Sequence, residues 1–253
     1  MQAVIMTGGL GTRLWPVTET IPKGLVEVGG RPFLEHLILY LKKFEIDDIL
    51  LCTGYLGEMI EEYFGDGSGL GVRIDYSLED HPLGTGGALR LALPKLREEF
   101  FLLNGDTFLP MDYSLMMAGF KTSSALMMVG VFPVGGSGAT PNLGIDDKEW
   151  IAASLTWLEG EELTHVDAGV RLVRKEIADF FPSEEVFSLE DDLYPRLIAA
   201  HKLNAWPVEQ RFYDIGTPER IKVFEEYLGN GNNKFKVPNV FYSAFRRRQS
   251  YGG

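Results

Sequence analysis

The chain has 253 residues, 45% of them hydrophobic and 24% charged, which are ordinary values for a soluble globular protein with a sizeable core. Its formal net charge of −12 argues against a general nucleic-acid binder, because a phosphate backbone requires clustered lysine and arginine. The single cysteine, Cys52, excludes an internal disulfide and fits a reducing compartment. The apolar runs are too short to span a bilayer and Met1 leads directly into a strand, so we expect a cytoplasmic protein with no membrane partner.

The first half of the chain alternates between predicted strands and predicted helices. Short apolar runs predict strands at residues 3–6, 26–28, 48–53, 72–77, 100–103 and 125–131. Apolar residues at helical spacing predict helices at residues 33–44, 57–64 and 88–93. This alternation favours an α/β fold with a Rossmann-like, doubly wound, mostly parallel mixed sheet and helices on both faces.

The second half of the chain is less regular. Strands are predicted within residues 150–158 and 168–173, and helices within residues 188–200, capped by Ser188, and from Pro218, capped by Thr217. From residue 229 onward the chain is polar and rich in glycine and asparagine. We therefore expect one domain over residues 1–228, followed by a flexible tail over residues 229–253.

A glycine-rich turn follows the first predicted strand. It reads Gly8-Gly9-Leu10-Gly11-Thr12-Arg13, and Lys23 comes ten residues after Arg13. Glycines let backbone N–H groups approach a polyphosphate, and the two cations supply the charge that a triphosphate needs. The turn is not a Walker loop, since no Gly-Lys-Ser/Thr ends it. For this segment alone, the alternative is a tight strand-to-helix turn with a surface arginine and a solvated Lys23.

Two aspartates follow short apolar segments. Asp106 follows Asn104-Gly105, and Asp214 follows Phe212-Tyr213. In a doubly wound sheet the ligand crevice lies at the carboxyl ends of the strands, where Gly8, Asp106 and the turn at Pro82 all fall. Each aspartate alone could be a turn former. As a pair opposite a phosphate loop, they favour a site for Mg²⁺, a hard cation that takes oxygen ligands.

Taken together, these motifs resemble those of the sugar-1-phosphate nucleotidylyltransferases. Residues 8–14 with Pro22-Lys23 are similar to the family signature, and residues 104–106 and 214–218 are similar to its two metal motifs. Residues 82–88 resemble its nucleobase-binding turn. The match runs in order from residue 1 to about residue 228 and is nearest to the short guanylyltransferases that act on heptose 1-phosphate. The resemblance implies a GT-A-like nucleotidyltransferase fold.

The resemblance also implies a reaction and a role for each matching residue. A sugar 1-phosphate oxygen would attack the α-phosphorus of a nucleoside triphosphate, for which we expect GTP, giving a nucleotide-sugar and pyrophosphate. Arg13, Lys23 and Asp106 would be the catalytic residues, and Asp106 and Asp214 would hold Mg²⁺. The implied substrate-binding residues are Gly8, Gly9, Gly11, Thr12, Pro82, Gly84, Thr85, Gly86, Asn104, Glu159, Asp167 and Gly169. The two substrates are the expected partners, and the resemblance is compatible with a homodimer.

Three positions depart from the family pattern. The family has a Glu-Lys pair in the region where this chain offers Glu159 followed by Gly160, so the lysine is missing. The family's Asn-x-Gly motif is represented here by Asp167-Ala168-Gly169. An asparagine side chain can donate and accept hydrogen bonds, whereas an aspartate can only accept them and adds negative charge near an anionic substrate. Gly24 stands where a proline commonly follows the lysine.

These departures leave the sugar open, and the turn at residues 82–88 does not define the base. A uridylyl- or thymidylyltransferase is therefore one alternative. A catalytically idle homologue that binds a nucleotide-sugar is another, because of the missing lysine. A glycosyltransferase is disfavoured, since residues 104–106 do not form an Asp-x-Asp motif.

Overall fold

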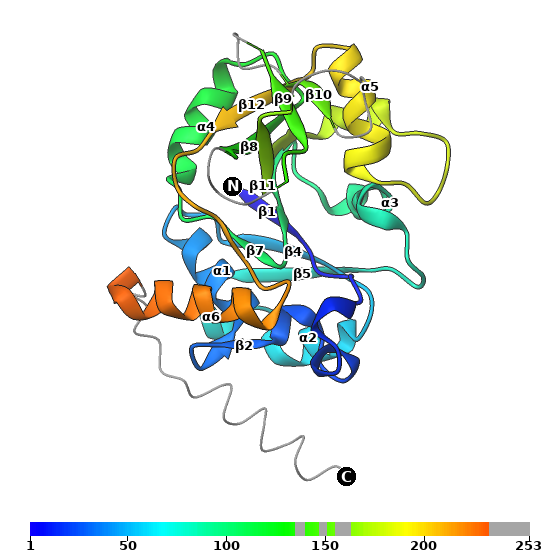
Figure 1. Ribbon diagram of the computed structural model, residues 1–253. Coiled ribbons are helices and arrows are strands. Elements are labelled where there is room, and N and C mark those ends of the chain that lie inside the picture. Colours follow the sequence, from blue (N-terminus) through cyan, green and yellow to red (C-terminus); the bar gives the residue numbers. More distant parts are fainter. Residues whose placement is uncertain (135–139, 147–150, 155–162, 233–253) are drawn as a thin grey trace.

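The computed structural model describes residues 1–134, 140–146, 151–154 and 163–232 (Figure 1). Its centre is a nine-stranded sheet with the order β10-β9-β11-β6-β1-β4-β5, in which β8 pairs with both β11 and β12. The strands of this sheet are β1 (Gln2–Met6), β4 (Asp48–Thr53), β5 (Arg73–Leu78), β6 (Glu99–Asn104), β8 (Met127–Pro133), β9 (Leu143–Ile145), β10 (Ile151–Ser154), β11 (His165–Arg174) and β12 (Leu203–Pro207). The sheet is mixed, because β5, β4, β1 and β6 are parallel and β11 is antiparallel to β6.

Alternate residues of the central strands face opposite layers of the molecule. Ala3 and Ile5 belong to one apolar cluster and Val4 to the other, as the two-residue period of a strand requires. Helices α1 (Phe33–Lys42), α2 (Gly57–Phe64), α4 (Tyr113–Thr122) and α6 (Pro218–Tyr227) cover the first face. Helices α3 (Gly84–Ala92) and α5 (Tyr194–Ala199) cover the second, as Figure 1 shows for α3 and α5 opposite α4. The predicted doubly wound α/β fold is confirmed.

Two small ribbons lie beside the main sheet. Strands β2 (Glu27–Val28) and β3 (Arg31–Pro32) form a hairpin that leads into α1. Strands β7 (Thr107–Phe108) and β13 (Tyr213–Asp214) pair in antiparallel register, so that Asp214 lies opposite Thr107. This second ribbon brings Asp214 next to Asp106 along the backbone, although more than a hundred residues separate the two in sequence.

Several element boundaries differ from the prediction. Helix α3 begins at Gly84 rather than Ala88, because the amides of Gly86 and Gly87 find an acceptor in Phe187 O, at 2.9 and 3.3 Å. Amides in the first turn of a helix have no partner within the helix, so this external acceptor lets the helix start earlier. The helix predicted over residues 188–200 is divided into a π-helical segment, Leu189–Leu193, and α5.

Other elements were missed or lie outside the described residues. Helix α4 and strand β12 were not predicted. Of the predicted strand at 150–158, residues 151–154 form β10 and the others lie outside the described residues, as do residues 233–253 of the predicted tail. Across the described ranges, no helix combines the length and the apolar character needed to cross a membrane.

Candidate active site

Four parallel strands end along one edge of the sheet, and the segments that follow them line a cavity of about 730 Å³. Glu79 follows β5, Gly54 follows β4, Gly8 lies just beyond β1 and Asp106 lies just beyond β6. This is the position at which doubly wound sheets bind ligands, and the volume suits a nucleotide-sized molecule. The convergence of the glycine turn, the Pro82 turn and Asp106 that we predicted is therefore observed.

The glycine turn is ordered by contacts with the segment that follows it. Gly11 takes a positive φ of 63°, and its carbonyl accepts a hydrogen bond from Thr18 Oγ1 at 2.8 Å. Thr12 and Arg13 then form a short 3₁₀ turn at the cavity wall. Gly9 has open space around its Cα, so its backbone is accessible from the cavity. The turn thus presents backbone and a cation to whatever occupies the cavity.

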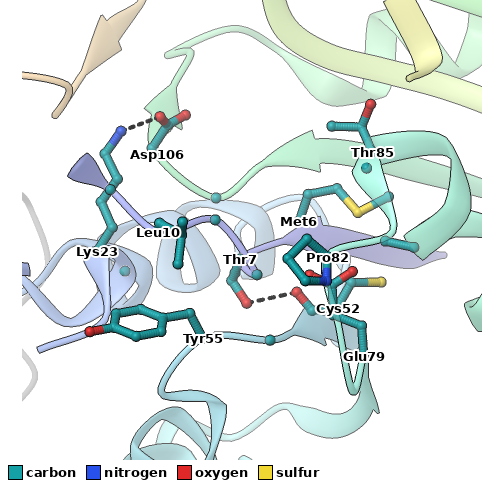
Figure 2. Close-up of a pocket in the computed structure, with 18 of the residues that line it drawn as sticks. Met6, Thr7, Leu10, Lys23, Cys52, Tyr55, Glu79, Pro82, Thr85 and Asp106 are labelled. Atoms are coloured by element: carbon teal, nitrogen blue, oxygen red, sulfur yellow. Dashed lines mark hydrogen bonds and ion pairs between the residues drawn. The ribbon is translucent and has the colours of Figure 1, made fainter. Parts of the chain in front are cut away.

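Lys23 and Asp106 form an ion pair at one end of the cavity, and Glu79, Pro82 and Thr85 lie at the other end (Figure 2). Asp106 also accepts a hydrogen bond from Thr107 Oγ1 at 3.0 Å. Both partners of the ion pair are partly buried but line the cavity. An ammonium and a carboxylate are therefore held together next to the glycine turn, where a phosphate group and its counter-ion would need them.

Asp214 lies behind Arg13 rather than on the cavity wall. A Cβ added to Gly216 would lie 2.7 Å from Asp214 Oδ1 and 3.3 Å from Arg13 Cζ, which places both groups around one glycine. The Asp214 carboxylate accepts from Arg220 Nη1 at 3.0 Å through each oxygen and from the Gly216 amide at 2.8 Å. Asp214 is thus next to Arg13, which lines the cavity, and its charge is balanced by Arg220.

Asp106 and Asp214 fit Mg²⁺ by the chemistry of their donor atoms. The described residues contain no group of three His, Cys, Asp or Glu side chains suited to a metal. A Mg²⁺ ion, however, is commonly held by one or two carboxylates together with substrate phosphates and waters. Asp106, which directly precedes β7, and Asp214 on the paired strand β13 offer two such carboxylates at the Lys23 end of the cavity.

Glu79 is a cavity residue that the sequence did not identify. Its Oε2 accepts the Leu83 amide at 3.2 Å, and its Oε1 lies 2.6 Å from where a Cβ would stand on Gly8 or on Gly54. The two glycines therefore leave room for this carboxylate at the ends of β1 and β4. Burial raises the pKa of Glu79 above its ordinary value, and the Leu83 amide and His81 oppose that shift. The signal available in the sequence was the position of Glu79 directly after a parallel strand.

A buried polar network lies next to Asn104 at the same edge of the sheet. Arg171 on β11 is at its centre; it donates from Nη1 to Asn104 Oδ1 at 2.8 Å and from Nη2 to Asp167 Oδ2 at 2.7 Å and Glu190 Oε1 at 2.8 Å. Its Nε donates to Tyr194 Oη at 2.5 Å. Burial disfavours the charge of Arg171, but the surrounding carboxylates outweigh it and hold its pKa above the usual range. Asp167, which we expected to add negative charge near an anionic substrate, is paired with the buried cation Arg171.

The structure brings most of the predicted site residues together. Those that line the cavity are Arg13, Lys23, Asp106, Gly8, Gly9, Gly11, Thr12, Pro82, Gly84, Thr85 and Asn104. Within the described part of the chain, Gly86, Asp167, Gly169 and Asp214 do not line it. Gly86 packs against the Phe187 ring, and a Cβ on Gly169 would lie 3.2 Å from Asn104 Nδ2. Glu159 lies outside the described residues.

Comparison with known proteins assigns this chain to a family. The family model described as "Nucleotidyl transferase" matches residues 2–141. The chain is 37% identical to the D-glycero-α-D-manno-heptose 1-phosphate guanylyltransferase of Campylobacter jejuni, over 87% of this chain and 96% of that protein. It is 34% identical to the enzyme of the same name from Aneurinibacillus thermoaerophilus, over 90% and 98%. It is 32% identical to the mannose-1-phosphate guanylyltransferase of Mycobacterium tuberculosis, covering 87% of this chain but 62% of that longer protein.

Solved structures with the same fold also match nearly the whole chain. The crystal structure of HddC from Yersinia pseudotuberculosis complexed with GMP-PN superposes with a TM-score of 0.73 at 27% sequence identity, over 90% of this chain and 99% of that one. A Bacillus anthracis structure shares the fold with a TM-score of 0.78 at 20% identity, over 96% and 99% of the two chains. The fold and the length of the match therefore extend well beyond the residues of the family model.

Proposed function

The chain belongs to the nucleotidyl transferase family, and from this premise we propose that it transfers a guanylyl group from GTP to a heptose or hexose 1-phosphate, with Mg²⁺, in the cytoplasm. The observation that carries the proposal is the grouping of Arg13, Lys23 and Asp106 around the glycine turn at one end of the cavity. Two relatives that this chain matches over nearly their whole length are named as heptose 1-phosphate guanylyltransferases.

The reaction is an in-line displacement at the α-phosphorus. An oxygen of the sugar 1-phosphate forms a new bond to the α-phosphorus, and the bond from that phosphorus to the oxygen bridging the α- and β-phosphates breaks, releasing pyrophosphate. The attacking oxygen is already anionic at neutral pH, so no side chain has to remove a proton from it. The reaction needs no protein nucleophile either. Cys52 lines the cavity, but burial raises its pKa to about 12, so it stays a protonated thiol.

Positioning and charge neutralisation supply most of the rate in such a transfer. Arg13 and the backbone of the glycine turn would hold the β- and γ-phosphates, and Lys23 would balance charge that develops at the reacting phosphorus. Asp106 and Asp214 would hold Mg²⁺, which would supply further neutralisation of the phosphates. Thr12 and Asn104, which line the cavity, would contact the substrates.

Glu79 favours guanine over uracil or thymine. Guanine presents its N1–H and its amino group side by side, and a carboxylate can accept from both at once. Uracil and thymine present a single N–H between two carbonyl oxygens, and these would face the carboxylate with like partial charge. Because Glu79 lies beside the Pro82–Thr85 turn that resembles the base-binding motif, we assign the base to this end of the cavity.

A pyrophosphate-release panel tests the proposal: four nucleoside triphosphates crossed with heptose, mannose, glucose and amino-sugar 1-phosphates, each with Mg²⁺ and with a chelator. We expect release with GTP and one of the first two sugars, lost with chelator and restored by added Mg²⁺. Lys23→Ala should abolish release, whereas Lys95→Ala should not, since Lys95 forms a comparable lysine–aspartate pair with Asp75 at 2.9 Å outside the cavity.

Other outcomes of the panel have distinct meanings. Release with UTP or dTTP alone would contradict the assignment of guanine. Silence across the panel, together with binding of GDP-mannose in calorimetry, would favour the catalytically idle homologue. Size-exclusion chromatography of the same preparations would test the homodimer, which stays a prediction.

A further inference from the structure

Arg171 connects three segments of the chain through one buried side chain. This side chain is 2% exposed and reaches β6 at Asn104, its own strand β11 at Asp167, and the continuous helical stretch of residues 189–199 at Glu190 and Tyr194. All of these contacts are within 2.8 Å. A planar guanidinium with fixed donor directions suits such multiple contacts, which a lysine could not reproduce.

The contacts with Arg171 determine what Asn104 and Glu190 offer to the cavity they line. Arginine has donors only, so the carbonyl oxygen of Asn104 must face it, and the amino group of Asn104 is the part left to donate to a ligand. Glu190 Oε1 accepts a hydrogen bond from Arg171, and Glu190 Oε2 accepts from Thr85 Oγ1 at 3.1 Å and from Ser188 Oγ at 3.2 Å. The Glu190 side chain is nevertheless 36% exposed.

The charge of this wall favours hydroxyl groups over phosphate. Asp167 and Glu190 carry two negative charges against the single positive charge of Arg171, which leaves an excess negative charge beside the cavity. A phosphate would be repelled, whereas a hydroxyl group can donate to a carboxylate that still has free lone pairs. The wall is therefore better suited to a ligand that offers hydroxyl groups than to one that offers phosphate.

The strand order places one end of this wall away from the base, because Asn104 and Arg171 lie on β6 and β11, while Glu190 reaches from them to Thr85 in the Pro82–Thr85 turn. Along the sheet edge the order is β5, β4, β1, β6 and β11, with Glu79 after β5, the glycine turn after β1 and Arg171 on β11. Phosphates bound at the glycine turn would thus lie between a base over β5 and an acceptor sugar over β6 and β11. An acceptor sugar in that position would present its hydroxyl groups to the end of the wall formed by Asn104, Arg171 and Glu190.

We infer that Glu190 binds hydroxyl groups of the acceptor sugar and that Arg171 is a positioning residue which, anchored by Asp167 and Tyr194, holds Glu190 and Asn104 in the orientation this requires. The inference rests on the proposed function for the identity of the ligand. It also accounts for the aspartate at position 167, because an asparagine there would leave the buried cation with less compensation.

The test measures binding of GDP and of GDP-mannose by calorimetry, and the ratio of the two affinities gives the contribution of the sugar. Glu190→Gln keeps the shape of the side chain and removes its charge. Arg171→Lys keeps the positive charge and removes the planar set of guanidinium donors. Each should lower the affinity for GDP-mannose about tenfold, the scale of one hydrogen bond to a charged group, and leave that for GDP within about twofold. In turnover assays the KM for the sugar 1-phosphate should rise and that for GTP should not.

The matched controls are Glu99 on β6 and Arg174 on β11, which form an ion pair at 3.3 Å. Glu99→Gln and Arg174→Lys alter a second glutamate–arginine pair, which involves β11 but lies outside the cavity, and should leave the sugar contribution unchanged. The inference would be overturned if the Glu190 and Arg171 variants lost equal affinity for GDP and for GDP-mannose, or if Glu190→Gln lost none. It would also be overturned if the wild type bound the two ligands equally well. Absence of turnover by the wild type would instead contradict the proposed function, so the two can fail separately.

Discussion

The ion pair between Arg171 and Asp167 gives a quantitative prediction for stability. The two side chains are 2% and 6% exposed, so water cannot replace either partner. Arg171→Met leaves the Asp167 carboxylate buried without its cation, which should reduce the free energy of unfolding by about 3–5 kcal/mol. Asp167→Asn keeps an oxygen that can accept from Arg171 and from Tyr194, and Glu190 still balances the guanidinium. Its amino group replaces the oxygen that accepts the Gly169 amide at 2.8 Å, so the cost should be about 1–3 kcal/mol.

The double variant, which combines Arg171→Met with Asp167→Asn, should be more stable than the sum of the two losses predicts. With both charges of the pair removed, no unpaired buried charge remains between the two positions, and the half-exposed Glu190 can be hydrated. We expect a coupling free energy of about 2 kcal/mol. Urea unfolding followed by circular dichroism, at a common m-value, measures all four proteins of this cycle.

An exposed pair serves as the control. Arg97 and Asp48 form an ion pair 3.1 Å long in which the side chains are 62% and 18% exposed. Asp48 keeps Arg73 as a second partner when Arg97 is replaced, so the coupling of this pair should be below about 1 kcal/mol. If the Arg171–Asp167 cycle gave a coupling no larger than this control, the two residues would not form the buried unit described above.

Three further predictions concern the cavity. Lys23→Ala or Asp106→Asn should abolish pyrophosphate release and leave the circular dichroism spectrum intact; unchanged turnover would contradict their assignment. Gly84→Ala should lower the free energy of unfolding by about 2–3 kcal/mol, because φ is 73° and a Cβ would lie 2.5 Å from Phe187 O, whereas Gly9→Ala should change it by less than about 1 kcal/mol. Burial raises the pKa of Glu79 above 4.5, so its charged form costs stability as the pH rises from 4.5 through the raised pKa, and Glu79→Gln should raise the free energy of unfolding at pH 7. Guanine-nucleotide affinity should fall as the pH is lowered from neutral into that window in the wild type but not in Glu79→Gln, and a parallel loss in both would refute the role of the carboxylate.

The parts of the fold that local patterns define were predicted well from the sequence. The strand at residues 48–53 and the helix at residues 57–64 were predicted with the bounds that the structure has. The glycine turn and Asp106 were brought together correctly, because the carboxyl ends of parallel strands must share an edge. Such inferences need only the alternation of elements and not the packing of individual side chains.

What the sequence did not reveal depends on contacts between distant segments. Arg171 reaches Asn104 across 67 positions, and Thr85 reaches Glu190 across 105. Each of these residues alone has an ordinary explanation, as a surface charge or a helix-start acid, and no local pattern selects it. Gly86 illustrates the converse, since a glycine in a motif suggested ligand contact but its missing side chain instead makes room for the Phe187 ring.

The contact between the start of α3 and residues 185–190 has a consequence for altering substrate range. Phe187 exchanges backbone hydrogen bonds with Leu83 and Gly86, and Thr85 binds both the Leu189 amide and Glu190. The turn to which we assign the base and the wall to which we assign the acceptor sugar are therefore joined by hydrogen bonds into one structural unit. If residues 82–88 were replaced by the corresponding loop of a relative, residues 185–190 would have to be replaced as well. Otherwise a change in nucleotide preference would also weaken binding of the sugar.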